Sequence, residues 1–362
     1  MTRVAILGAG AGGLSSAVEL GRAGHEVRLW SRNEATIRPY EERGAVPYRG
    51  VLGEGSEKLS TVTSCLDEAL ASVDVVIVCL PALAHEAVFA YLARSGCSVP
   101  VVLNPGHTGG ALHARAVFRA QGAAAPPVAE LSTLTYVARV GLDAAVHITC
   151  RAAHVRCGAL PGGEAAIDAA QELFSCATRA DDVLASSLAN VNLVLHPPGA
   201  ILAAAWVEAP GHEFTFYVEG LTPGVARVMA ALDEERLAVA RCLGHELPPL
   251  VEEMALIGTV DEEQVRSGSA REAILAGSAN REIAAPRSLR HRYYEEDLPF
   301  GLGSFLALSR IAGVPVRTAD ALFALGGTLL GRDLRRDGLG ARELGIEGLD
   351  GAGLLELVGR KR

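Results

Sequence analysis

The sequence predicts an α/β protein in which an N-terminal, doubly wound α/β domain (residues 1–180) is followed by an all-helical C-terminal domain (residues 181–362). In the first part, short Val- and Leu-rich runs alternate with helical patterns, which is typical of a parallel sheet covered on both faces. After about residue 180 the strand patterns stop and helical periodicity continues alone. A chain of 362 residues is also longer than one ordinary domain, which favours two.

Composition excludes several classes of protein. With 49% hydrophobic and 21% charged residues, the chain can bury a sizeable core and is not disordered. Its net charge of −9 argues against a general nucleic-acid-binding protein. We expect no membrane span, because no apolar run of 18 residues is free of charge, and no signal peptide. The seven scattered cysteines form no Cys-x-x-Cys pair, so we expect no disulfide framework, no metal site and a reducing cytoplasm.

The elements of the first domain follow from its short apolar runs. "RVAILGAG" predicts a strand that enters a glycine turn, and residues 14–23 predict a helix that ends at Gly24. "HEVRLW" predicts the second strand. Five further strands are expected, at residues 73–81, 100–106 and 127–130 and in "AVHITCR" and "HVRCGAL".

The second domain reads as a series of helices. The longest is expected to begin at Pro223, with Thr222 as its N-cap and Gly244 as its stop. Three more are expected in "GSFLALSRIAGV", in "TADALFALGGTLLGRDL" and at the end of the C-terminal stretch.

A glycine motif near the N-terminus predicts a Rossmann-type dinucleotide site. Gly8, Gly10 and Gly13 form G-x-G-x-x-G, with Ala9 in the turn, between a predicted strand and a predicted helix. The helix N-terminus then offers free N–H groups to a pyrophosphate. The structural alternative is a glycine-rich loop without a ligand.

The residues at the end of the second strand indicate whether the cofactor is NADP or NAD. An acidic residue there would bind a ribose 2′-hydroxyl, whereas this sequence has Ser31 and Arg32. A hydroxyl and a guanidinium suit a 2′-phosphate, so we favour NADP. Glu34 or another register leaves NAD open, and Arg32 also fits a plain surface residue.

Leu80 and Pro81 end another strand of this sheet. At that position we expect them to pack near the nicotinamide, although Pro81 also fits a simple turn. His85 follows on the next helix, where we expect it to be exposed to solvent.

A missing residue type narrows the chemistry of the helical domain. Several dehydrogenase families that combine these two kinds of domain use a lysine there, but here that domain contains only Lys361. A histidine must then handle the proton. We favour His196, because Pro197 is expected to end its helix and turn the side chain toward the cleft. A hydrogen-bonded core histidine is the equally simple alternative.

A second polar stretch offers partners for His196. In "HRYYEEDLPFGLG", Asp297 precedes Leu-Pro at an expected helix end, and Arg292 lies five residues before it. A histidine oriented by a carboxylate, with an arginine to hold a substrate carboxylate, is a hydroxy-acid dehydrogenase arrangement. A solvated charged loop is the alternative, and we expect Glu295 and Glu296 to be solvated.

At this point the chain resembles the opine dehydrogenases of the octopine and nopaline type, over essentially its whole length. The matching stretches, in the family's order, are "LNPGHTGGALHARAV", "AELSTLTYVARV", "NVNLVLHPPGAIL", "FYVEGLTPGVARVMAALDEERLAVA" and "RYYEEDLPFGL". The resemblance implies that His196 and Asp297 form the catalytic pair and that Arg292 contacts substrate.

Two departures from the family affect the substrate side. His107 stands where the family often has arginine in "NPGRTGG", and "ELSTL", which contains Thr133, replaces "ETQTL". His107 and Thr133 are therefore further candidates for substrate binding, although His107 also fits a structural loop residue.

The resemblance implies NAD(P)H-dependent reductive condensation of an amino acid or related amine with a 2-oxo acid, through an imine, to a secondary amine. His196 would supply the proton, Asp297 would fix the imidazole tautomer, and Arg292 would hold a carboxylate. The alternatives are a 2-hydroxy-acid or ketone dehydrogenase, an imine reductase of a secondary-metabolite pathway, and a non-catalytic NADP-binding protein. We also expect a homodimer that binds neither nucleic acid nor a membrane.

Overall fold

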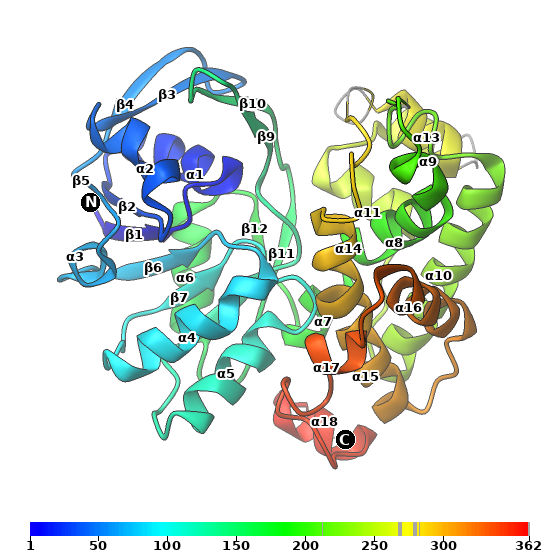
Figure 1. Cartoon of the computed structure of the whole chain (residues 1–362). Helices are drawn as coiled ribbons and strands as arrows, with labels where there is room; N and C mark the ends of the chain where they lie inside the picture. Colours follow the sequence, from blue (N-terminus) through cyan, green and yellow to red (C-terminus); the bar gives the residue numbers. More distant parts are fainter. Residues whose placement is uncertain (212, 267–269, 278–280, 282, 361–362) are drawn as a thin grey trace.

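The computed structural model describes residues 1–211, 213–266, 270–277, 281 and 283–360. Figure 1 shows two lobes, one built around sheets and one built of helices. The last strand ends at Arg179, and only helices, apart from one isolated β-bridge, follow it among the described residues. The division at residues 1–180 and 181–362 stays a prediction, and Lys361 lies outside the described residues.

An eight-stranded sheet forms the centre of the first lobe, as the sequence predicts for an α/β protein. The strand order is β12-β11-β8-β7-β6-β1-β2-β5, and all pairs are parallel except β8 with β11. The strands are β1 Arg3–Leu7, β2 Glu26–Trp30, β5 Thr61–Thr63, β6 Val75–Val78, β7 Val101–Leu103, β8 Val128–Leu131, β11 Val155–Ala159 and β12 Ala177–Arg179. Their apolar residues are almost fully buried, because helices cover both faces.

A second, four-stranded sheet was not predicted. Its order is β4-β3-β10-β9, with β3 Ala45–Gly50, β4 Gly55–Lys58, β9 Tyr136–Val140 and β10 Val146–Arg151. Helix α1 (Ala11–Arg22) packs against β1 and β2 and also against β3, β4, β9 and β10, so it lies between the two sheets. The sheet pairs residues as far apart in the chain as Tyr48 and Val146, and a local sequence pattern does not predict such long-range pairing.

The remaining elements of the first lobe pack around the large sheet. Helices α4 and α5 pack against each other, and α6 contacts β7, β8, β11 and β12. The helices are α2 Glu34–Glu41, α3 Leu66–Leu70, η1 Ala82–Ala84, α4 His85–Arg94, α5 Gly110–Ala120 and α6 Glu164–Leu173.

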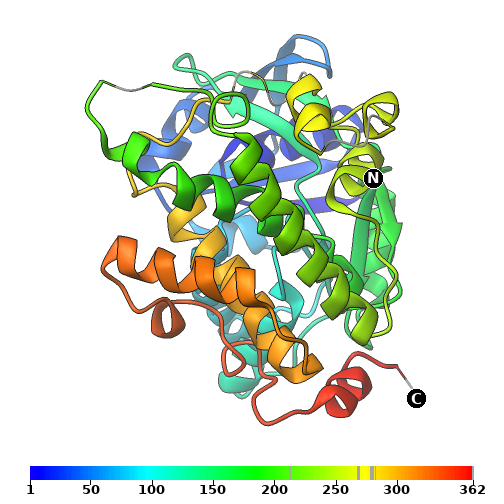
Figure 2. The ribbon, with the colours of Figure 1, turned by 90° about the vertical axis from the view of Figure 1, so that its right-hand side faces the viewer.

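The second lobe is helical, and Figure 2 shows the long helix α10 crossing it diagonally beside α16. Thr222 caps α10 as predicted, its Oγ1 accepting from the Val225 N–H (3.3 Å), and Gly244 follows the helix with a φ of +81°. The helices are α7 Val183–Leu188, α8 Asn192–Leu202, α9 Ala204–Glu208, α10 Pro223–Cys242, α11 Leu250–Ile257, α12 Glu262–Val265, α13 Ala270–Ala276, α14 Arg292–Glu295, the π-helix η2 Asp297–Leu302, α15 Gly303–Ala312, α16 Arg317–Leu330, α17 Leu334–Asp337 and α18 Gly351–Leu357.

The expected helix end at His196 is wrong, because α8 continues through Pro197 and Pro198 to Leu202. Near Asp297 a helix does end, since α14 stops at Glu295, but the chain does not leave helical geometry there: η2 begins at Asp297 and runs through Pro299 into α15. Residues 193–200 are buried, and α8 packs against α10, α14, α16 and η2. This tertiary packing outweighs the cost of prolines inside a helix.

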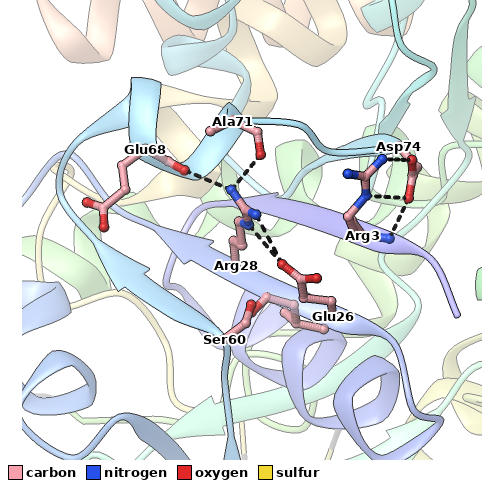
Figure 3. A network of polar contacts seen from close by, with 8 residues as sticks. Arg3, Glu26, Arg28, Ser60, Glu68, Ala71 and Asp74 are labelled. Carbon is pink, nitrogen blue, oxygen red and sulfur yellow. Dashed lines mark hydrogen bonds and ion pairs between the residues drawn. The ribbon is translucent and has the colours of Figure 1, made fainter.

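Charged networks hold the sheet at the end away from its carboxyl edge. Arg3 donates from its backbone and its guanidinium to Asp74, and Arg28 bonds Glu26 and the carbonyls of Glu68 and Ala71 (Figure 3). The Arg3 contacts join β1 to the start of β6, and the Arg28 contacts tie β2 to the end of α3. The opposite, carboxyl ends of β1, β2 and β6 lead into the loops that carry the predicted cofactor residues.

Among the described residues, no helix is both long and apolar enough to cross a membrane.

Candidate active site

The glycine turn has the geometry of a phosphate-binding loop. Gly8 has a φ of +125°, and a Cβ there would lie 2.3 Å from the Cys79 carbonyl oxygen. A Cβ on Gly13 would lie 1.8 Å from the Gly8 carbonyl oxygen, so neither position accepts a side chain. Gly10, the N-cap of α1, has open space where its Cβ would be. A ligand can therefore approach the backbone at this helix N-terminus.

The other predicted cofactor residues lie along the same edge of the sheet. The strand order reverses at β1, which lies between β2 and β6, and ligands of such sheets bind where the order reverses. Ser31 follows β2 and is buried, its Oγ accepting from the Asn33 N–H (3.3 Å), while Arg32 is exposed. Leu80 and Pro81 follow β6. These positions, together with the turn at Gly8, fit a dinucleotide that lies across the switch point.

His196 and Asp297 come together from residues 101 positions apart. His196 Nδ1 lies 2.7 Å from Asp297 Oδ2, and His196 Nε2 lies 2.9 Å from the Tyr217 hydroxyl. The imidazole also stacks on the Tyr293 ring at a centroid distance of 4.0 Å and an interplanar angle of 29°. All four side chains are buried. The histidine is thus held by a carboxylate on one nitrogen and a phenol on the other.

Both tyrosines beside His196 keep their protons. Burial, reinforced by Tyr293 and Asp297, raises the pKa of Tyr217 well above its ordinary value. Burial also raises the pKa of Tyr293, although Arg292 opposes the shift. At neutral pH each hydroxyl is therefore available as a hydrogen-bond donor.

Arg292 is half exposed and is tethered on one side by Glu296. It begins α14, its side chain is 46% exposed, and its Nε lies 3.2 Å from Glu296 Oε2. Partial burial lowers the pKa of Arg292, but the carboxylates of Asp297 and Glu296 more than offset this and raise it. A fixed, exposed guanidinium can pair with a carboxylate in two parallel hydrogen bonds.

Glu296 was expected to be solvated, and that expectation is wrong. It is 2% exposed, and its Oε1 accepts from the Ala82 N–H (2.7 Å) and lies 3.0 Å from His107 Nε2. Burial opposes ionisation, but His107 and Arg292 hold the pKa of the Glu296 carboxyl well below its ordinary value. The π-helical turn at residue 297 sends two consecutive acidic side chains inward, one toward each lobe. No spacing rule for regular helices reveals this.

His107, in the loop after β7, and His85, the first residue of α4, are both buried. His107 has a φ of +58°, and its ring lies 5.7 Å from that of His85. His85 is 1% exposed, and its Nε2 lies 3.1 Å from the Leu80 carbonyl oxygen, so the expected solvent exposure is wrong. Burial, and then the neighbouring His107 and His113, lower the pKa of His85 to about 3. It packs inward because α4 lies against α5.

The loop after β8 carries the last predicted residue, Thr133, which is buried. Among the described residues, Thr133 makes no hydrogen bond with His196, Asp297 or Arg292, so the structure does not bring it into this cluster. In the same stretch, "ELSTL", Glu130 has a structural role. Its carboxyl group accepts hydrogen bonds from the Ser186 and Ser187 hydroxyls and from the Ala111 N–H. Burial raises the pKa of Glu130 to about 7, although these hydrogen bonds act to lower it. Glu130 therefore joins β8 to α5 and α7.

Comparison with known proteins adds to this geometry. A family model described as NAD/NADP octopine/nopaline dehydrogenase, alpha-helical domain, matches residues 179–330. A model described as ketopantoate reductase PanE/ApbA matches residues 4–104. Opine dehydrogenase of Arthrobacter sp. (strain 1C) is 31% identical over 358 residues, which cover 98% of both chains.

Solved structures show the same fold. Octopine dehydrogenase with NADH and L-arginine superposes with a TM-score of 0.76 at 20% identity, covering 100% of this chain and 99% of that one. Yersinopine dehydrogenase with NADP⁺ bound has a TM-score of 0.74 at 16% identity, covering 96% of this chain and 98% of that one. These two solved structures therefore contain both lobes of this chain in the same arrangement.

Proposed function

The chain belongs to the opine dehydrogenase family, and we propose that it joins an amino acid or related amine to a 2-oxo acid at the His196 site. It is an NAD(P)-dependent oxidoreductase that acts on CH–NH, and the reaction is a reductive condensation through an imine to a secondary amine. The observation that carries the site assignment is the buried His196–Asp297 pair, 2.7 Å apart, beside the exposed guanidinium of Arg292.

We assign the proton work to His196. The amine adds to the 2-oxo carbon, and the resulting carbinolamine loses its hydroxyl as water only if that oxygen receives a proton. The imidazolium of His196 supplies this proton as the amine lone pair forms the C=N bond. Asp297 accepts from Nδ1–H, fixing the tautomer and stabilising the imidazolium. The nicotinamide, when bound, supplies the hydride that reduces the C=N carbon.

We assign the binding of a substrate carboxylate to Arg292. Its guanidinium is exposed on one side and held by Glu296 on the other, so a carboxylate can pair with it without first ordering the side chain. His107 and Thr133 remain proposed substrate contacts: they lie in the loops that follow β7 and β8 at the carboxyl edge. His107 also acts on Arg292 indirectly, through Glu296.

The cofactor is NAD or NADP, and we propose NADP as the preferred form. Gly8, Ala9, Gly10 and Gly13 would hold the pyrophosphate, with Leu80 and Pro81 beside the nicotinamide. Ser31 and Arg32 would hold a 2′-phosphate, a role supported by the exposure of Arg32 at the end of β2.

An NADPH-consumption screen tests this function. Amino acids and simple amines are each combined with pyruvate, 2-oxoglutarate or glyoxylate, and the product is identified by its mass. We expect NADPH oxidation only when both substrates are present, with a product mass equal to amine plus 2-oxo acid minus one oxygen atom. NADPH oxidation that persists without the amine identifies a 2-hydroxy-acid dehydrogenase. If NADPH is not oxidised with any pair of substrates, both the condensation and the 2-hydroxy-acid dehydrogenase activity are contradicted.

We also propose that the chain acts as a homodimer in a reducing cytoplasm. The seven cysteines are free thiols, which suits such a compartment. Leu202 and Trp206, 50% and 47% exposed, line an apolar hollow of about 490 Å³ on the helical lobe. Exposed apolar surface of this kind is typical of subunit interfaces.

A further inference from the structure

Both imidazole nitrogens of His196 are engaged by the protein. Asp297 Oδ2 lies 2.7 Å from Nδ1, and the Tyr217 hydroxyl lies 2.9 Å from Nε2. Since Asp297 orients Nδ1, any proton that leaves the imidazole does so from Nε2. The first atom that it meets there is the Tyr217 oxygen.

The direction of the His196–Tyr217 hydrogen bond depends on the charge of the imidazole. In neutral His196, with its proton on Nδ1, the Nε2 lone pair accepts from the Tyr217 O–H. In protonated His196, Nε2–H donates to the Tyr217 oxygen, and the phenolic hydrogen must turn elsewhere. The charged histidine thereby leaves the Tyr217 hydrogen free to turn to another acceptor. The Tyr293 hydroxyl, which shares a hydrogen bond with Tyr217, is one such group, and a substrate oxygen beside them is another.

Tyr217 is held firmly in this place. Its neighbour Phe216 donates its backbone N–H to the Ile283 carbonyl (2.8 Å), and Thr215 forms a bridge with Ala284. A Cβ on Gly199, three residues after His196, would lie 2.7 Å from the Phe216 ring. The glycine of "HPPG" thus lets the segment that carries Tyr217 pack directly on α8.

The Tyr217 hydroxyl lies among the groups that we assign to the proposed substrate site. The charges of Asp297 and Arg292 both act on it, and the ring of Tyr293 covers His196 on one side. Because Tyr217 is buried and remains protonated, it acts as a neutral donor rather than as a second negative charge.

We propose that Tyr217 is a further catalytic residue, which passes the proton from His196 to the departing oxygen of the substrate. As the C–O bond of the carbinolamine breaks, that oxygen takes the phenolic hydrogen of Tyr217, and Tyr217 takes the hydrogen of His196 Nε2. Tyr217 ends unchanged, His196 becomes neutral, and water leaves. This step rests on the proposed function, because it requires the carbinolamine.

Tyr217→Phe tests the relay, since it removes only the hydroxyl. We expect the kcat of the condensation to fall about 100-fold, a typical contribution of a general acid, with an unchanged dissociation constant for NADPH. Proton delivery then limits the rate. The isotope effect measured with NADPH deuterated at the transferred position should therefore fall toward 1.

Tyr294→Phe is the matched control. Tyr294 is also a buried tyrosine of the helical lobe, but its hydroxyl donates to the Ala200 carbonyl (2.7 Å). We expect this variant to lose some thermal stability and to keep the wild-type kcat. A comparable loss of kcat in both variants contradicts the relay, because a general loosening of the lobe then explains it.

Two further outcomes overturn the proposal. A Tyr217→Phe enzyme with wild-type kcat shows that His196 reaches the substrate directly, with Tyr217 displaced. A slow variant whose isotope effect keeps a wild-type value above 1, or exceeds it, shows that the hydroxyl only maintains the site. Failure of the wild-type enzyme to condense any amine with any 2-oxo acid counts against the proposed function instead.

Discussion

Glu296 and Asp297 are adjacent carboxylates that serve different lobes. Asp297 holds His196 within the helical lobe, whereas Glu296 accepts from the backbone of Ala82, just beyond Pro81 at the sheet edge. The same Glu296 holds Arg292 and His107. One side chain therefore sets the position of the proposed carboxylate clamp relative to the cofactor edge.

Glu296→Gln should weaken substrate binding more than turnover. The amide keeps the shape of the carboxylate but loses the charge that orients Arg292, so we expect the KM of the 2-oxo acid to rise about tenfold. Steady-state kinetics at saturating NADPH measure this. The neighbouring Glu295→Gln is the control and should leave KM within twofold of wild type. Equal KM values for the two variants would rule out this role of Glu296.

Arg32→Ala should reduce the preference for NADP. An exposed guanidinium at the end of β2 can pair with a 2′-phosphate but gains little from a 2′-hydroxyl. We expect the KM of NADPH to rise at least tenfold while that of NADH changes less than twofold. Arg38→Ala, a substitution on α2 outside the proposed phosphate contacts, serves as the control. A parallel change for both cofactors would identify Arg32 as a plain surface residue.

Single site residues can be predicted from the sequence when their chemistry calls for a particular kind of partner. His196 and Asp297 were paired because a histidine needs a carboxylate, and the structure brings them to 2.7 Å. Tyr217 and Glu296 could not be found this way. A tyrosine in an aromatic stretch reads as core, and a glutamate in an acidic run reads as surface.

At the scale of elements, Glu130 connects strand β8 with helices α5 and α7 through three hydrogen bonds. Its pKa is raised to about 7 in the folded protein, chiefly by burial. A carboxyl whose pKa is raised on folding contributes stability that is complete below its unfolded pKa and is lost as pH rises through the folded value. The loss should thus develop between about pH 4.5 and pH 7.

Glu130→Gln should remove this pH dependence, because an amide does not titrate. We expect the stability of wild type relative to the variant to decline by on the order of 3 kcal/mol between pH 4.5 and pH 8. Urea unfolding of both proteins across this range measures the difference, and other titrating groups, such as His85, cancel in it. A difference that is constant with pH would show that Glu130 titrates normally.

The elements that the sequence predicts best have strong local signals. The Val-rich strands β6 and β7 and the capped helix α10 lie where they were expected. The failures have long-range causes. The polar strand β4, "GSEK", gains its pairing only from β3, and α8 continues through two prolines because helices of the second lobe pack around it.

At the scale of the whole molecule, the two lobes meet along the carboxyl edge of the large sheet. The Ala82 N–H meets Glu296 there, and the Gly109 N–H donates to Ser187 (3.0 Å). Arg156 on β11 makes a two-pronged pair with Glu253 on α11 elsewhere between the lobes. The class of each lobe was predictable from its periodicity, whereas these contacts were not.

Trp206→Glu tests the proposed dimer. A charge in the apolar hollow beside Leu202 should separate the subunits, because it would be buried without a partner. Sedimentation velocity should show a dimer for wild type and a monomer for the variant. Leu142→Glu, at a fully exposed position on the other lobe, should leave the dimer intact. A monomeric wild type would refute the dimer outright.

We propose that His196 is the acid of the condensation and not a core histidine. The most direct measurement compares His196→Ala with wild type in kcat at saturating substrates and in the dissociation constant of NADPH. We predict that kcat falls by at least about 100-fold while NADPH binding and folding are retained, since His196 lies outside the glycine turn. A variant that turns over at the wild-type rate would show that His196 is a core histidine and not the acid.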